Sequence, residues 1–115
     1  MILSYIVNDI CYRGKVKMIR TFFLGFIRLH IVYHASKEPI FGLDMIRELS
    51  RHGYKLSPGT LYPILHNLEK EGYLVTKKQV VSGKVRKYYQ ATLSGIKALS
   101  QAIDKANELI NEIKS

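Results

Sequence analysis

Cysteine, tryptophan and acidic residues are all scarce in this chain. Its 115 residues include one cysteine, Cys11, and no tryptophan, and nine acidic residues stand against 18 lysines and arginines. One cysteine cannot form an intrachain disulfide, so we expect a protein of the reducing cytoplasm. The lack of tryptophan excludes a tryptophan stacking platform for a ligand.

A long hydrophobic run is also missing. The most apolar stretch, Phe22 to Tyr33, is short and carries Arg28 and His30, which argues against a transmembrane span. A membrane partner is not expected either, because the basic residues cluster on a predicted hairpin and not on an amphipathic helix. Four charged residues between positions 9 and 17 lie where a secretory signal would be cleaved. Hydrophobic residues still make up 47% of the chain, too many for a disordered basic tail. We expect one soluble domain over 1–115, with residues 1–14 as an N-terminal extension.

Most of the positive charge lies in one short segment. Residues 77–88 contain Lys77, Lys78, Lys84, Arg86 and Lys87 and no acidic residue, so they supply five of the nine net charges. A local excess of this kind is the electrostatic footprint of a surface that contacts a polyanion. Lysines that only keep an exposed pair of strands soluble would give the same pattern. On charge alone both interpretations stay open.

Residues 15–36 have the spacing of a helix with apolar residues on two sides. One stripe consists of Ile19, Phe22, Phe23, Phe26 and His30, and the other of Leu24, Ile27 and Ile31. A surface helix of a globular protein needs only one apolar stripe. We therefore expect the second stripe to contact another chain or the C-terminal helix.

Two shorter helices are predicted over 41–52 and 58–71. Their apolar spacing turns Leu43, Ile46 and Leu49 inward in the first, and Leu61, Ile64, Leu65 and Leu68 in the second. Gly53 and Gly72 follow the last turns as typical stops. Ser57 is a strong N-cap for the second helix, and the proline after it loses no hydrogen bond at the first helical position.

A hairpin and a last helix complete the chain. The segments 73–81 and 84–91 alternate in the manner of strands and are joined by Ser82-Gly83, which predicts the hairpin. Thr92 can cap a helix over 93–113. Its apolar seam steps by three and four residues through Ile96, Leu99, Ile103, Ala106, Ile110 and Ile113. Because the other positions are mostly polar, we favour a dimerisation seam over packing on the helix's own domain.

This order of elements is that of a winged helix-turn-helix, a mainly α fold with a small β-hairpin (α+β class). We assign residues 15–91 to the winged helix-turn-helix and residues 92–115 to a C-terminal dimerisation helix. In this interpretation the helix 58–71 enters the major groove of double-stranded DNA, and the basic hairpin 74–91 forms the wing that contacts phosphates.

Four motifs closely resemble the PadR family of transcriptional regulators. They are FGLDMI at 41–46, LSPGTLYPIL at 56–65, LEKEGYL at 68–74 and RKYYQAT at 86–92, followed by Gly95. Departures are mild, such as Phe41 where the family usually has tyrosine. The single C-terminal helix resembles the short subfamily. The resemblance implies a homodimeric winged-helix repressor, in which the C-terminal helix of each subunit packs against the N-terminal helix of the other.

The candidate site residues follow from this interpretation. Those expected to contact DNA from the helix 58–71 and its cap are Ser57, Gly59, Thr60, Tyr62, His66, Asn67 and Lys70, and those from the wing are Lys77, Lys78, Lys84, Arg86 and Lys87. The candidate dimerisation residues are Phe22, Phe23, Phe26, Ile96, Leu99, Ile103, Ala106, Ile110 and Ile113. Packing against the wing or the first helix is an equal alternative for Tyr62.

An enzyme is not expected, and neither is a cofactor. The chain has no glycine-rich phosphate loop and no recognisable Ser/His/Asp context. The family resemblance implies instead that a small hydrophobic or phenolic effector binds near the dimer interface. Such a site would be lined by Phe22, Phe23, Phe26, Ile96 and Leu99, although a core role is the stronger interpretation of these residues.

A metal-responsive regulator and a protein-interaction module are the alternatives to a DNA-binding repressor. His30 and His34 lie four residues apart on one predicted helix and can present two imidazoles to a metal. Two ligands are too few, so Asp9, Cys11, Glu38 or a partner chain would have to complete the set. We therefore assign no metal ligand. The acid-free hairpin argues against a winged helix that binds only protein.

Overall fold

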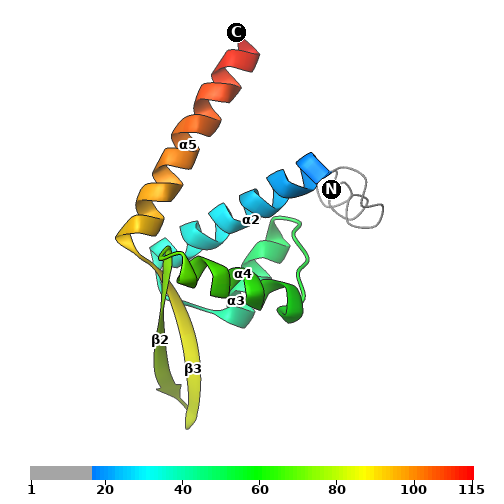
Figure 1. Ribbon diagram of the computed structural model, residues 1–115. Helices are drawn as coiled ribbons and strands as arrows, with labels where there is room; N and C mark the ends of the chain where they lie inside the picture. Colours follow the sequence, from blue (N-terminus) through cyan, green and yellow to red (C-terminus); the bar gives the residue numbers. More distant parts are fainter. Residues whose placement is uncertain (1–16) are drawn as a thin grey trace.

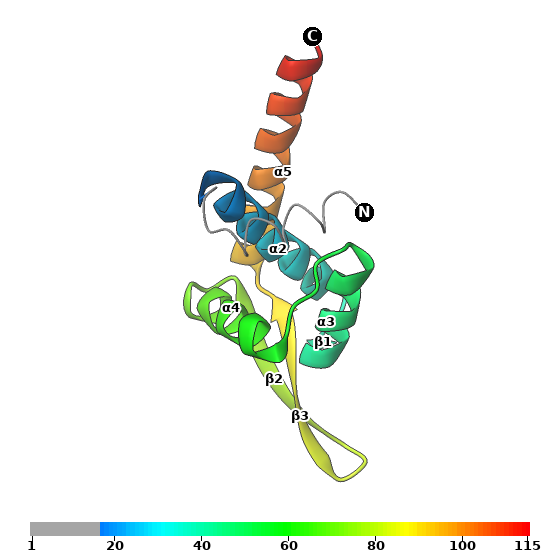
Figure 2. The same ribbon diagram turned by 90° about the vertical axis from the view of Figure 1, so that its right-hand side faces the viewer.

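The computed structural model describes residues 17–115, so the predicted extension at 1–14, with Asp9 and Cys11, lies outside the described residues. Within them the elements are α2 (Lys17–Lys37), β1 (Ile40–Phe41), α3 (Gly42–Arg51), α4 (Pro58–Lys70), β2 (Leu74–Val81), β3 (Lys84–Ala91) and α5 (Leu93–Lys114). The β2–β3 hairpin extends below the helices and α5 extends above them (Figures 1 and 2). This confirms the α+β winged-helix prediction. Among the described helices, none has the length and apolar character needed to cross a membrane.

The core lies between α2, α3, α4 and the base of the hairpin. Its buried members are Phe23, Ile27, Ile31, Val32, Ala35, Met45, Leu49, Tyr54, Leu61, Ile64, Leu65, Leu68, Leu74 and Tyr89. Phe23, Ile27 and Ile31 are four residues apart and share one face of α2, whereas Phe22 is 58% exposed and Phe26 is 39% exposed. The assignment of Phe23 to the dimerisation face is therefore wrong, because its ring packs within its own chain.

Helix α3 shows a second correction. Leu43, predicted to point inward, is 46% exposed, and Met45 is fully buried in its place. The helix begins at Gly42, and Gly42, Met45 and Leu49 lie three and four residues apart on its buried face. Gly53 follows with a φ of +89°, the left-handed conformation that favours glycine, so the predicted stop is confirmed.

Helix α4 agrees with its prediction at both ends and on its inward face. The Ser57 hydroxyl accepts a hydrogen bond from the Thr60 backbone N–H at 3.3 Å, as an N-cap does. The buried residues are Leu61, Ile64, Leu65 and Leu68. Gly72 has a φ of +87°, and the N–H of the next residue donates to the Leu68 carbonyl at 2.9 Å.

The hairpin is part of a three-stranded antiparallel sheet in the order β1-β3-β2. Strand β1 was not predicted; it has two residues and pairs through Ile40 with Tyr89 and through Phe41 with Tyr88. Ser82 and Gly83 both have positive φ, 53° and 78°, as a two-residue type I′ turn requires. The turn fixes the register of the hairpin, and with it the positions of the wing's charged side chains.

Helix α5 is held at its first turn. The Thr92 hydroxyl accepts from the Gly95 N–H at 3.0 Å and donates to the Gly72 carbonyl at 2.6 Å, so one side chain joins the ends of two helices. Gly95 is buried, and a Cβ there would overlap the Tyr73 carbonyl oxygen, which explains why glycine is needed. The first half of α5 passes beside α2, and its C-terminal half extends away from the rest of the described chain (Figure 1).

Candidate nucleic-acid interface

The face of α4 opposite the core is open. Its four buried residues all lie on one side, so the predicted DNA contacts on the other side are exposed: Ser57, Gly59, Thr60, His66, Asn67 and Lys70, with Tyr62 at 39%. A Cβ at Gly59 would meet only the Ser57 hydroxyl, at 3.8 Å. The start of the helix therefore combines an accessible backbone with the partial positive charge of a helix N-terminus, a combination that suits a phosphate.

Tyr62 differs from the other predicted contacts. Its hydroxyl and ring lie so close to Gly42, the first residue of α3, that a Cβ on that glycine would overlap them. Tyr89 is 4% exposed; burial, and then the nearby Tyr62 and Glu69, raise its pKa. Tyr62 thus packs where α3, α4 and the sheet meet. This geometry favours the packing interpretation of Tyr62 over a base contact.

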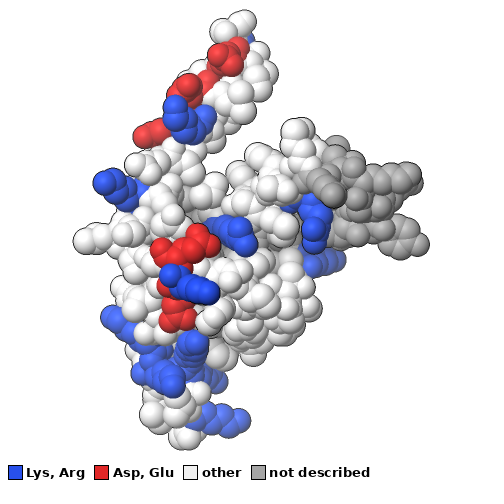
Figure 3. All heavy atoms as spheres, viewed as in Figure 1, with Lys and Arg blue, Asp and Glu red and all other residues white. Residues whose placement is uncertain are grey.

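The wing carries its cations on both faces. Residues directly opposite in an antiparallel pair share a face, so Lys78 lies beside Lys87, on the face that continues toward the core through Tyr89. Lys77, Lys84 and Arg86 lie on the other face. In Figure 3 the blue spheres of lysine and arginine gather over the lower hairpin, and the red spheres of acidic residues lie above it. The positive potential is therefore concentrated at the projecting end of the molecule.

Two side-chain contacts join the wing to its surroundings, one to α4 and one to β1. Thr76 of β2 donates a hydrogen bond to Glu69 of α4, with 2.8 Å between the oxygens. The Arg86 guanidinium lies 5.0 Å from the centre of the Phe41 ring, within the range of a cation–π contact. The Thr76–Glu69 hydrogen bond fixes the wing relative to α4, and the Arg86–Phe41 contact fixes it relative to β1.

The predicted dimerisation residues, apart from Phe23, lie on two incompletely covered surfaces. On α2 the exposed large residues include Phe22, Phe26 and Tyr33. On α5, Ile96, Ile103 and Ile110 are 43–47% exposed, Ile113 is 74% exposed, Ala106 is exposed and Leu99 is half-buried. Leu109, which is not among the predicted dimerisation residues, is 56% exposed and widens the stripe. Two apolar surfaces thus remain to be covered.

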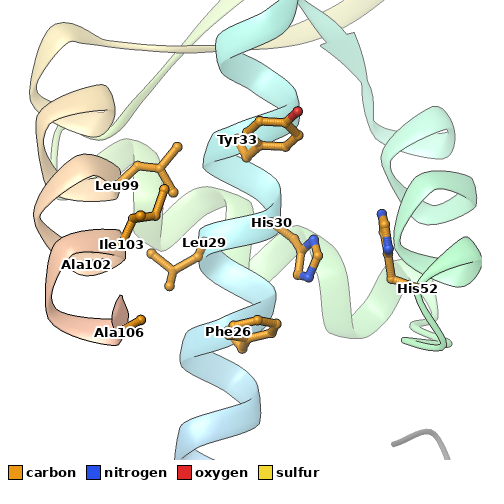
Figure 4. A pocket seen from close by; sticks show the side chains of 9 residues that line it. All are labelled: Phe26, Leu29, His30, Tyr33, His52, Leu99, Ala102, Ile103 and Ala106. Carbon is orange, nitrogen blue, oxygen red and sulfur yellow. The ribbon is translucent and has the colours of Figure 1, made fainter. Parts of the chain in front are cut away.

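A groove of about 230 Å³ runs between α2 and α5 (Figure 4). Its lining consists of Phe26, Leu29, His30, Tyr33, His52, Leu99, Ala102, Ile103 and Ala106. Of the five residues expected around an effector, only Phe26 and Leu99 line it. The groove was not predicted because Leu29 and Ala102 come together only when α2 and α5 cross.

Three of the four histidines of the chain form a cluster beside this groove. One ring nitrogen from each of His30, His34 and His52 lies within 4.8 Å of the others. Burial, and then His52 and His34, lower the pKa of His30, and burial lowers the pKa of His34 although Glu48 opposes it. The sequence indicated the first two but missed His52, which is remote in sequence. Glu38, named as a further ligand, lines a different pocket with Asp44 and Arg47.

Known proteins are similar to this chain in sequence and in fold. Residues 31–101 match the model of the transcriptional regulator PadR-like family. The chain is 46% identical over 94 residues to a Mycobacterium tuberculosis protein named transcriptional regulator Rv3488, covering 82% of this chain and 88% of the relative.

Solved structures agree with this match. A crystal structure from Streptococcus mutans UA159 is 35% identical, with a TM-score of 0.68, and the match covers 76% of this chain and 82% of that one. A PadR-like transcription factor from Bacteroides fragilis is 28% identical, with a TM-score of 0.70 and coverage of 84% and 98%. The chain therefore belongs to the PadR-like family of transcriptional regulators, DNA-binding proteins that are not enzymes.

Proposed function

We propose that this regulator is a sequence-specific repressor that acts in the cytoplasm as a homodimer. Helix α4 enters the major groove, where Thr60, His66 and Asn67 contact bases, and the wing 74–91 contacts phosphates. Phosphate contacts position the protein, and base contacts select the sequence. The observation that carries the proposal is the acid-free wing tethered to the open face of α4.

The register of the wing supports a polyanionic partner. Lys78 and Lys87 lie directly opposite each other on one face, and like charges in that position destabilise a hairpin. Phosphates bound by the two ammonium groups, one to each, would offset the repulsion. Because α4 itself carries Lys70 against Glu69, with Glu71 just beyond it, most of the electrostatic affinity has to come from the wing.

A second copy of the chain is the proposed partner for the apolar surfaces. The seam of α5 and the exposed aromatic residues of α2 form two complementary stripes on one subunit. In a two-fold dimer, α5 of each subunit packs on α2 of the other. The same contact then forms at two symmetric places and buries both stripes of both subunits. Contiguous exposed apolar surface of this kind is unusual on a monomeric protein. The dimer also places two copies of α4 on one duplex.

An effector would bind in the α2–α5 groove. Its lining is almost entirely apolar, with the Tyr33 ring and two imidazoles at its edge, which suits a small hydrophobic or phenolic molecule. Both helices of the groove belong to the proposed dimer interface. A bound molecule that changes their crossing would change the spacing of the two α4 helices and release DNA.

The test is a titration of the purified protein against a fluorescent duplex from its own upstream region and against a scrambled duplex. Mass is measured in parallel at three salt concentrations. Tighter binding of a dimer to the upstream duplex, with repression of a reporter in its presence, is the expected result. Equal binding to both duplexes would contradict sequence specificity at that site. The absence of binding at low salt would contradict DNA binding by the free protein and favour a protein-interaction module.

A further inference from the structure

The cluster of His30, His34 and His52 can be joined by one ion. His30 and His34 lie one turn apart on α2, and His52 caps the C-terminal end of α3, so two elements supply three imidazoles. The ring centres of His30 and His52 are 4.6 Å apart, and those of His34 and His52 are 5.8 Å apart. In Figure 4 the rings of His30 and His52 point toward each other, on the side of α2 away from Leu99 and Ile103.

We propose that these three histidines form a site for a divalent transition metal, with Zn²⁺ as the best fit. In a tetrahedral zinc site with Zn–N bonds of about 2.0 Å, the nitrogens lie about 3.3 Å apart. The three ring nitrogens lie within 4.8 Å of one another, so small rotations of the rings would bring them to this distance. Three neutral imidazoles with one open position are a known donor set for zinc, and imidazole also suits copper, nickel and cobalt.

One observation besides the spacing supports a ligand here. The Nε2 atom of His34 is buried without a hydrogen-bond partner among the described residues, which is a costly arrangement for a polar atom. A metal ion bound between the three rings would give this nitrogen a partner.

Glu48 is the candidate for support around the ion. It lies one turn before His52 on α3, and its charge acts on His34. At present its carboxylate pairs with Arg51 at 3.2 Å, at the surface. A carboxylate in this position can accept an imidazole N–H and fix the ring for binding, as outer carboxylates do in zinc sites. The loss of Glu48 should therefore weaken the metal less than the loss of a histidine.

The site would tie the helix-turn-helix to α2. His52 ends α3, directly before the turn that leads to α4, whereas α2 carries one of the two exposed apolar surfaces. His30 and His52 also line the α2–α5 groove, so the ion and a molecule in the groove would share two residues. Metal binding should therefore stabilise the α2–α3 junction, and this effect is measurable without DNA.

The test uses the full chain, free of any affinity tag and stripped of metal with a chelator. Zn²⁺ is titrated by calorimetry and Co²⁺ by visible absorption, and the variants are His52→Ala, His34→Gln and Glu48→Gln. The control is His66→Gln, which changes the remaining histidine on the outer face of α4. His52→Ala is the primary variant because His52 is exposed, so its folding should be least affected. Thermal unfolding without metal checks every variant.

The expected result is one Zn²⁺ per chain and a higher unfolding temperature with metal. His52→Ala and His34→Gln should weaken the metal at least about tenfold, Glu48→Gln less, and His66→Gln not at all. Failure of both Zn²⁺ and Co²⁺ to bind would overturn the proposal. So would wild-type affinity in folded His52→Ala, since that result would place the metal elsewhere.

Discussion

Helices α4 and α5 are held in opposite ways. Helix α4 has 13 residues and buries four large apolar side chains against its own chain. Helix α5 has 22 residues, of which Gly95 alone is buried within the described chain. The orientation of α4 is therefore set by one subunit, whereas α5 exposes a stripe that a single subunit does not cover. The difference separates the part that would contact DNA from the part that would bring two such parts together.

The wing, which would contact DNA together with α4, and the C-terminal segment with α5 also differ in charge. The wing has five cations and no acid between residues 77 and 88, while residues 89–115 have three cations and three acids. One example on α5 is the exposed pair of Lys105 and Glu108, 3.2 Å apart. Added salt should weaken the contact of the wing with a polyanion. It should leave an apolar contact of α5 intact, so salt separates the two functions.

The largest effect is expected from a charge placed in the apolar seam of α5. Ile103→Glu should raise the dimer dissociation constant at least about 100-fold, because each dimer would bury two uncompensated carboxylates. Sedimentation equilibrium measures the effect. The control is Gln101→Glu, which adds the same charge on the polar side of α5 and should leave the dimer intact. A dimer that tolerates Ile103→Glu would show that the seam is not the interface.

The next change removes charge from the wing. The double variant Lys78→Gln/Lys87→Gln should reduce the slope of log K against log salt by about 3 to 4 for a dimer, because four phosphate contacts are lost. Fluorescence anisotropy at several salt concentrations gives the slope. Lys97→Gln/Lys105→Gln on α5 removes the same charge and should keep the wild-type slope. Equal slopes for both double variants would mean that only net charge matters.

Alanine substitutions at two glycines of α3 and α4 separate an effect on stability from an effect on DNA binding. Gly42→Ala places a methyl group against Tyr62 and should reduce the free energy of unfolding by about 1–3 kcal/mol, measured by urea denaturation. Gly59→Ala has room for its methyl group and should keep that stability. It should still weaken DNA binding, because the methyl group covers the start of α4. Unchanged DNA affinity in Gly59→Ala would argue against a close phosphate at that position.

The smallest expected effect concerns the base of the wing at high pH. Burial, Tyr62 and Glu69 raise the pKa of Tyr89 above its unfolded value of about 10, and the Lys87 ammonium lies 5.6 Å from its ring centre. Its contribution is therefore complete below about pH 10 and is lost as the pH rises further, since only the unfolded state ionises easily. Tyr89→Phe should therefore reduce the alkaline loss of stability.

Urea denaturation at pH 9 and pH 11 measures this difference. Tyr88→Phe, on the other face of the same strand, is the control for removing one phenol. An alkaline loss that is the same in Tyr89→Phe and in the wild type would contradict the role of burial at Tyr89.

Local signals predicted most of the fold. The cap at Ser57, the stops at Gly53 and Gly72 and the turn at Ser82-Gly83 depend on a few adjacent residues, and all are confirmed. The inward face of α4 was also correct because four apolar residues leave no choice of face. The two-residue strand β1 was missed, since two residues have no measurable alternation.

Errors arose where several faces of a helix are apolar. Phe22 and Phe23 are the same residue type, and only the position of α3 and α4 decides which ring is buried. In α3 the apolar spacing selected Leu43, whereas Met45 is the residue that the fold buries. The site at His52 was beyond prediction because its neighbours come from α2, and their distance depends on the α2–α3 crossing.

The most direct test of the account is the salt dependence of DNA binding by the wild-type chain, with the mass of the complex measured in the same samples. If a dimer neutralises about six phosphates, log K should fall with log salt at a slope near −5, and the complex should contain two chains per duplex. A single chain per duplex, or an affinity that does not change with salt, would contradict a dimer that holds DNA through its wings.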